Sequence, residues 1–219
     1  MPTKTRSPAS APASGPKRRG RPRGARATEP LQDRLLDAAL ALFAQRGIAD
    51  TPLSAVAAEA GVTKAMIHYH FSTREKLLDA LIEERFLPLR TSLLQTLRVH
   101  DDPVDALTAF VGNLVAQARA CPWLPALWVR EVTSQGGLLR AQMRARLDAI
   151  GEQRTVARIE AWQREGRLPA GLKPELLLMS IFGMTMLPLA ALGGTVSAAA
   201  TDAIVENAVT LLTRGVATK

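Results

Sequence analysis

Residues 51–78 read TPLSAVAAEAGVTKAMIHYHFSTREKLL, and this stretch decides the fold. Its apolar residues recur at helical spacing, which predicts a short helix over residues 53–60. Gly61 stops that helix, and Thr63 is placed to cap another helix over residues 64–70. Two short helices joined by a tight turn that contains glycine are typical of a helix-turn-helix.

Start and stop signals bound the neighbouring helices as well. Thr51 can cap the second helix, and Pro52 costs no hydrogen bond at its first position. The first helix is expected to begin after Thr28 or Glu29 and to end at Gly47, where glycine tolerates the conformation that many helix ends need.

The outer face of the third predicted helix is the candidate for reading DNA. Ala57 and Gly61 lie four residues apart, so their small size lets the two short helices approach closely. The shared core is expected to contain Val56, Val62, Ile67 and Phe71. The major groove admits an α-helix whose N-terminal residues meet base edges. The residues left for this contact are Thr63, Lys64, Ala65, Met66, His68, Tyr69 and His70.

Side-chain chemistry assigns roles within this set. Lys64 can donate to guanine acceptors, and Ala65 and Met66 can contact a thymine methyl group. Phosphate contacts suit hydroxyl, imidazole and guanidinium groups, and the amide ends of short helices. The candidates for phosphate contacts are Thr51, Tyr69, His70 and Arg74.

The histidine pair does not indicate a metal site. His68 and His70 are two residues apart, so on a helix they point to nearly opposite sides and cannot hold one ion together. His100 is the only other histidine. We therefore expect no metal and no cofactor.

The rest of the chain also follows helical spacing, with no convincing strand pattern. Ser72 to Glu75 form a capping-box sequence that opens a longer fourth helix, which Pro88 is expected to bend or end. Further helices are expected over residues 102–120, 125–133, 138–165, 174–192 and 197–213. The fold class is therefore all-α with about nine helices: a three-helix DNA-binding domain over residues 29–75 and a helical ligand-binding and dimerisation domain over residues 76–219.

The N-terminal 28 residues are expected to be a disordered basic arm. They hold eight basic residues and no acidic one, and the remaining 20 basic residues balance the 20 acidic ones, so the arm carries the whole formal charge of +8. Such an arm on a neutral body suggests a polyanionic partner. Arg19, Arg21 and Arg23 flank Gly and Pro as in an AT-hook, which lies in A·T-rich minor grooves; a generic basic tail is the alternative.

Residues 31–78 resemble the DNA-binding domain of the tetracycline-repressor (TetR) family. The ordered matches are LLDAA at 35–39, LF at 42–43, Gly47, VA at 56–57, AGVT at 60–63, IHYHF at 67–71 and REKLL at 74–78. The resemblance implies DNA contacts at the positions named above. The family usually has Tyr at the position of His68, Lys at that of Arg74 and often Gly at that of Ala65, so a phosphate contact from His68 is either pH-sensitive or absent.

The C-terminal part resembles the family more weakly. Family architecture implies an effector pocket within the middle helices and a homodimer interface built from the last two. Aromatic and Met side chains suit pocket walls, although for any single one of them simple core packing is the more common role. The candidates are Phe110, Trp123, Trp128, Met143, Trp162, Met179 and Phe182.

These features predict a cytoplasmic, ligand-responsive transcriptional regulator. It is expected to bind a near-palindromic double-stranded DNA operator as a homodimer and to act most often as a repressor, although activation stays open. The apolar stretch over residues 176–192 is interpreted as a buried helix rather than a membrane span. An architectural A·T-rich DNA-binding protein is the first alternative. An enzyme is the second, disfavoured because no recognisable catalytic motif is present.

Overall fold

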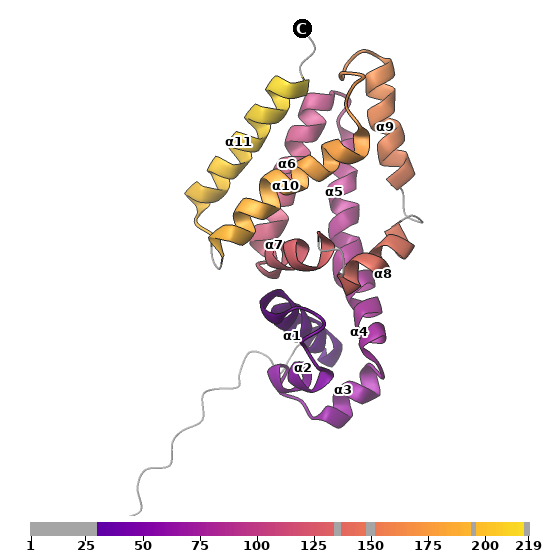
Figure 1. The fold of residues 1–219 in the computed structure, drawn as a ribbon, viewed down its shortest axis with the longest axis vertical. Helices are drawn as coiled ribbons and strands as arrows, with labels where there is room; N and C mark the ends of the chain where they lie inside the picture. The colour runs from indigo at the N-terminus through magenta and orange to yellow at the C-terminus, as the bar shows by residue number, and fades with distance from the viewer. Residues whose placement is uncertain (1–29, 134–136, 148–151, 194–195, 217–219) are drawn as a thin grey trace, which may run out of the picture.

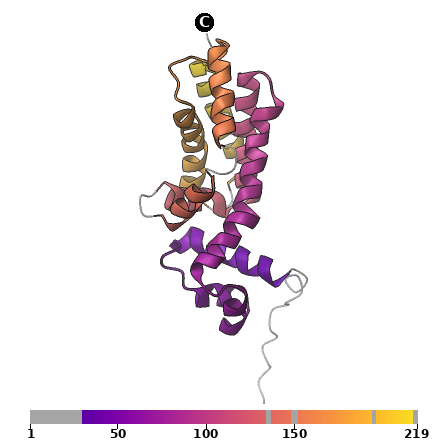
Figure 2. The same ribbon diagram turned by 90° about the vertical axis from the view of Figure 1, so that its right-hand side faces the viewer.

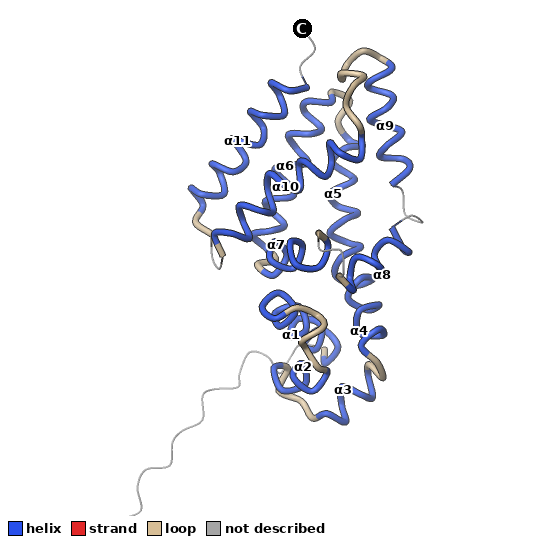
Figure 3. The backbone as a smooth tube through the Cα atoms, in the orientation of Figure 1, coloured by secondary structure: helices blue, strands red, loops and turns tan. Residues whose placement is uncertain are grey.

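The computed structural model describes residues 30–133, 137–147, 152–193 and 196–216, and within them every regular element is a helix. The helices form a small lower head and a larger upper body, as Figure 1 shows, and Figure 3 contains no strand among these residues. The predicted all-α class is confirmed. The described residues form ten continuous helical runs rather than nine, because residues 138–165 hold two helices, α8 (Leu138–Leu147) and α9 (Glu152–Arg164).

The head consists of three helices with a common core. They are α1 (Leu31–Arg46), α2 (Leu53–Glu59) and α3 (Lys64–His70). Phe43, Val56 and Ile67, from these three helices in turn, are fully buried together. The turn glycine between α2 and α3, Gly61, has φ +69°, a backbone conformation that L side chains rarely adopt. Predicted bounds for α3 agree with the structure, and Thr63 caps it by accepting from the Met66 amide at 3.3 Å.

The N-cap residues of α1 and of the fourth helix differ from the predicted ones. Pro30, not Thr28 or Glu29, is the residue preceding α1, and the latter two lie outside the described residues. Thr73, not Ser72, caps the fourth helix, accepting from the amide of Lys76 at 3.3 Å. Both Ser72 and Thr73 carry hydroxyls, so local sequence did not distinguish the two registers.

One helical run over residues 74–99 connects head to body. It comprises α4 (Arg74–Leu81), the π-helical turn η1 (Ile82–Phe86) and α5 (Leu87–Val99). The helical run continues through Pro88 and does not end there. Figure 2 shows the run as one long rod. Proline lacks the amide that would bond to the carbonyl of Glu84, and the widened turn, in which Leu87 N–H donates to Ile82 O, accommodates this loss.

The remaining helices make up the rest of the body. They are α6 (Pro103–Ala120), α7 (Trp123–Leu127), a second π-helical turn η2 (Trp128–Val132), α10 (Pro174–Leu192) and α11 (Ala198–Val216), together with α8 and α9. Helix α6 packs between α5, α10 and α11, and α7 lies directly above α1 of the head (Figure 1). The head and the body therefore meet at α1, α7 and the two π-helical turns.

Candidate DNA-reading face and effector cavity

Helix α3 lies at the lower end of the head (Figure 1), and most of its side chains are exposed to solvent. Ile67 is its one buried residue, whereas Met66 is 40% exposed and Tyr69 is 88% exposed. Large apolar groups left open on a short helix have no packing role in the monomer, which is typical of a contact surface. The predicted DNA-contact residues Thr63, Lys64, Ala65, Met66, His68, Tyr69 and His70 are all exposed.

A hollow beside α3 is lined by basic side chains and by the residues at the start of α2. Lys64 and His68 lie one turn apart on α3 and line this hollow, and Arg74 faces them from the start of α4. The other lining residues are Pro52, Leu53, Ser54 and Glu75. Ser54 was not predicted; its place in the first turn of α2, where amide groups are unpaired, was the available signal.

Thr51 is the one predicted phosphate-contact residue that the described structure places inside. It is 1% exposed, and its hydroxyl donates to the carbonyl of Gly47 at 2.7 Å, so it neither faces solvent nor caps α2. Its own carbonyl accepts from Arg74 Nη2 at 3.3 Å. Thr51 therefore holds the loop between α1 and α2 and positions Arg74. Arg19, Arg21 and Arg23 lie outside the described residues.

The body holds a partly open apolar cavity of about 350 Å³. It lies among α5, α6, α7, α8, α9 and α10 and reaches both π-helical turns. Five of the seven predicted pocket residues line it: Phe110, Trp128, Met143, Met179 and Phe182. The other lining residues are Phe86, Leu89, Arg90, Leu93, Leu94, Leu114, Gln117, Leu124, Val132, Thr155, Val156, Glu175 and Leu178.

Trp123 and Trp162 lie outside the lining of this cavity. Trp123 packs edge-on against the cavity-lining residue Phe86, with ring centroids 5.3 Å apart, and does not itself line the cavity. Trp162 is fully buried, and its Nε1 donates to the carbonyl of Asp101 at 3.0 Å. An indole with a satisfied N–H and no exposed surface is a packing residue.

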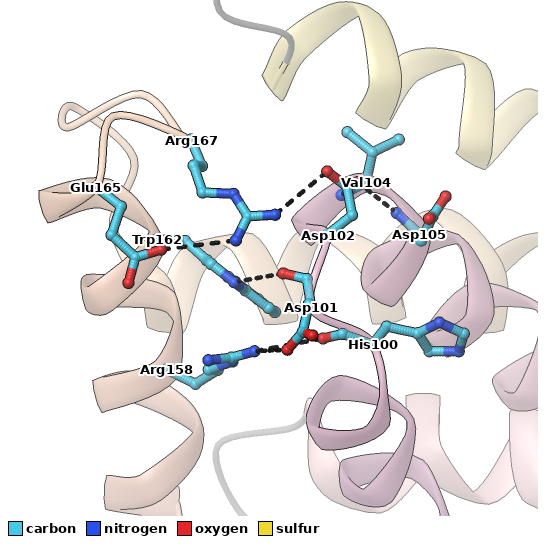
Figure 4. Close-up of polar contacts among 9 residues, drawn as sticks. All are labelled: His100, Asp101, Asp102, Val104, Asp105, Arg158, Trp162, Glu165 and Arg167. Atoms are coloured by element: carbon cyan, nitrogen blue, oxygen red, sulfur yellow. Dashed lines mark hydrogen bonds and ion pairs between the residues drawn. The ribbon is translucent and has the colours of Figure 1, made fainter.

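The contacts of Trp162 belong to a polar cluster that fastens α9 to the turn between α5 and α6 (Figure 4). Arg158 lies over the Trp162 ring at 4.8 Å and pairs with Asp101 at 3.2 Å. Arg167 pairs with Asp102 at 3.5 Å. Asp102 caps α6. The pKa of its carboxyl group is lowered, mainly because the carboxylate accepts a hydrogen bond from the backbone amide of Asp105. The cluster anchors one end of α9 while Thr155 and Val156, nearer its other end, line the cavity.

Each π-helical turn joins the cavity to the head. In η1, Phe86 lines the cavity, and the neighbouring Arg85 pairs with Asp33 at 2.7 Å and with Asp37 at 3.3 Å on α1. Burial opposes the charge on Arg85, but these two carboxylates outweigh it and raise its pKa. Glu84 adds a hydrogen bond from Gln32 of α1.

In η2 the same arrangement is buried. Trp128 and Val132 line the cavity, while Glu131, between them in sequence, is 6% exposed. Its carboxylate accepts from the backbone amide of Ile48 at 3.0 Å, two residues after the end of α1. One five-residue turn therefore contains both residues that line the cavity and a residue that contacts the head.

Helix α10 is not the buried helix that its apolar sequence predicted. It is long and apolar enough to span a membrane by composition, yet only 28% of its most apolar window is buried inside the protein. Met186 and Leu189 belong to the core, whereas an outward face stays open. Large exposed side chains on α10 and α11 are Leu176, Met179, Leu187, Leu192 and Leu211. We call these five residues the outer apolar face; Met179 among them also lines the cavity.

Metal ligation has no support in the described parts of the chain, where no group of three or more His, Cys, Asp or Glu side chains is placed to hold an ion.

The head contains two short helices, α2 and α3, of which α3 is exposed, and it sits on a helical body. This arrangement defines a helix-turn-helix DNA-binding protein. The family profile described as "Bacterial regulatory proteins, tetR family" matches residues 35–81, and that of "YcdC-like protein, C-terminal region" matches residues 84–214. The chain belongs to the TetR family, whose members are transcriptional regulators. The resemblance seen in the sequence is thus confirmed.

Similar proteins support this assignment. The HTH-type transcriptional regulator RutR of Escherichia coli (strain K12) is 28% identical over 160 residues, which is 73% of this chain and 74% of RutR. The ketosteroid transcriptional regulator KstR2 of Mycobacterium tuberculosis has the same fold, with a TM-score of 0.69 and 17% identity over 90% of this chain and 100% of that one. AibR, solved with isovaleryl coenzyme A and operator DNA, has a TM-score of 0.66 and 19% identity over 83% of this chain and 97% of that one.

Proposed function

We propose that this protein is a homodimeric, cytoplasmic transcriptional repressor that leaves its operator when a small, mostly apolar effector fills the cavity. One observation carries the proposal: both π-helical turns hold cavity-lining residues next to residues that contact the head. A ligand shifts an equilibrium only when it binds one state better than the other. An effector that displaces Phe86 or Trp128 changes the setting of Arg85 and Glu131, and with them the orientation of the head.

On DNA, α3 enters the major groove with Lys64 donating to a guanine and Met66 against a thymine methyl. His68, Tyr69, His70, Arg74 and Ser54 contact phosphates. Two heads of a dimer meet successive major grooves about 34 Å apart, so the operator is a near-palindrome. AibR, which was solved with both isovaleryl coenzyme A and operator DNA, supports this pairing of a ligand with an operator.

The outer apolar face forms the dimer interface. Its five large apolar side chains are between 53% and 63% exposed in the monomer, over the last two helices. Exposed apolar surface of this extent on neighbouring helices marks an interaction site. A two-fold axis across α10 and α11 covers it with a four-helix interface.

Genomic binding-site selection with the purified full-length protein tests the proposal. We expect a short near-palindrome, followed by release when compounds related to the neighbouring genes are added. Uniform coverage of A·T-rich DNA, with no palindrome and no release, would contradict it.

The substitution Lys64→Ala is expected to weaken operator binding roughly tenfold and to relax the base preference at one position of each half-site, because a base-edge contact contributes about 1–3 kcal/mol. Fluorescence anisotropy with operator variants measures both effects. Arg46→Ala is the control, since Arg46 is an exposed cation at the end of α1 and does not line the α3 hollow. Unchanged base preference in Lys64→Ala would remove the assigned role.

Deletion of residues 1–28 is expected to lower the salt dependence of operator binding. Each phosphate that the arm neutralises contributes about 0.9 to the slope of log K against log salt concentration. The operator sequence selected is expected to stay the same in its two half-sites, because α3 is intact. An unchanged slope would show that the arm does not contact DNA.

A further inference from the structure

The amide side chain of Gln117 is the one buried polar group in the cavity wall with an unused hydrogen-bonding atom among the described residues. It is 8% exposed. Its Nε2 donates to the carbonyl of Leu89 at 3.2 Å and to Oδ1 of Asn113 at 3.1 Å. Its Oε1 is buried without a partner, which a protein interior seldom tolerates.

The orientation of this amide is fixed by its neighbours. Asn113 Nδ2 donates to both the carbonyl and the hydroxyl of Ser92 at 3.2 Å, so Asn113 presents its oxygen to Gln117. The Leu89 carbonyl can only accept. Turning the Gln117 amide over would set its oxygen against two oxygens, so Oε1 is the end that remains for another donor.

Flat aromatic surfaces form part of the same wall. Trp128 and Phe182 are stacked, with centroids 5.7 Å apart and planes 14° apart, and Phe110 meets Phe182 edge-on at 6.0 Å. Phe110, Leu114 and Gln117 line the cavity from one face of α6, since residues three and four apart share a helix face. The aromatic rings and the side chain of Gln117 therefore line the same cavity.

The charged residues of the lining do not favour an ionic ligand. Arg90 and Glu175 bring one charge of each sign. Most of the remaining lining is aliphatic or aromatic.

We propose that the effector is a neutral ring compound with a hydroxyl group, a phenol or a cyclic alcohol, whose hydroxyl donates to Oε1 of Gln117. The proposal rests on the effector cavity of the proposed function and names the chemistry that this cavity selects. The ring lies against Trp128 and Phe182, and the hydroxyl satisfies the one orphaned acceptor of the wall.

Two bicyclic probes of nearly equal shape test the proposal. 2-Naphthol has the donor, whereas 2-methoxynaphthalene keeps the ring and the oxygen but has no donor. Their dissociation constants are measured with the full-length protein by fluorescence titration, for the wild type, Gln117→Met and the control Leu114→Met. Leu114 lines the cavity one turn before Gln117 and offers no acceptor.

In the wild type, 2-naphthol is expected to bind more tightly than the more hydrophobic 2-methoxynaphthalene. Gln117→Met is expected to reduce the ratio of the two affinities about tenfold, the value of one hydrogen bond to a buried group, and Leu114→Met to leave the ratio unchanged. The reverse order in the wild type overturns the proposal even if Gln117→Met fails to fold. Binding of both probes without preference overturns the donor assignment alone; binding of neither overturns it together with the apolar cavity of the proposed function.

Discussion

Leu187→Glu is expected to convert the protein into a monomer and to lower operator affinity by about a hundredfold or more. Leu187 is 57% exposed on α10, in the outer apolar face. In a two-fold interface each residue occurs twice, so one substitution places two carboxylates there. A buried charge without a partner is strongly unfavourable.

The loss of operator affinity follows from the loss of the second head. A dimer binds its second half-site at a high effective concentration, and a monomer forfeits this gain, which amounts to about 10²–10⁴. Analytical ultracentrifugation gives the assembly state, and anisotropy with the operator gives the affinity.

Val99→Glu is the matched control for this substitution. Val99 is 63% exposed at the end of α5, outside the outer apolar face, and therefore tests the effect of adding a carboxylate to an exposed aliphatic position. We expect this variant to stay dimeric and to bind the operator normally. If Leu187→Glu also stays dimeric, the interface does not run over the outer apolar face.

The elements themselves could be predicted from sequence because their signals are local. Thr63 caps α3 as expected, and Gly47, at φ +87°, ends α1. Both features depend on residues within one turn of each other. The same locality misled the assignment of Thr51, whose hydroxyl suits a helix cap but donates to the carbonyl of Gly47 in a buried loop.

The walls of the cavity could be predicted only in part. Trp128 and Trp162 have the same chemistry, yet one lines the cavity and the other is fully buried beside Asp101. Their difference arises from how α9 packs on the turn between α5 and α6, which no local pattern encodes. Gln117 was missed for a similar reason, since its orphaned oxygen results from contacts with Leu89 and Asn113.

The contact between Glu131 and Ile48 joins residues 83 positions apart, so it too was beyond the reach of sequence patterns. It leads to the second large effect. Glu131→Ala is expected to lower the free energy of unfolding by about 1–3 kcal/mol, because the buried amide of Ile48 is left without its acceptor. Thermal or urea denaturation measures this change.

The local consequence at the junction is more specific than the loss of stability. The amide of Ile48 is expected to exchange with solvent one to two orders of magnitude faster in Glu131→Ala, since each 1.4 kcal/mol of lost protection is about tenfold in the opening equilibrium. Hydrogen exchange followed by mass spectrometry or NMR reports on this segment. The operator affinity is expected to fall as well, because Ile48 precedes Thr51, which positions Arg74.

Glu131→Gln separates the hydrogen bond from the charge and from general packing. Glutamine keeps the shape and an oxygen that accepts from Ile48, so slow exchange at Ile48 and most of the operator affinity are expected to remain. Because Trp128 and Val132 flank position 131 in the cavity wall, 2-naphthol bound to the wild type is expected to change exchange at Ile48, and bound to Glu131→Ala to leave it unaltered. Equal responses in the two proteins would show that the cavity signals to the head by another route, with Arg85 and its two aspartates as the next contact to test.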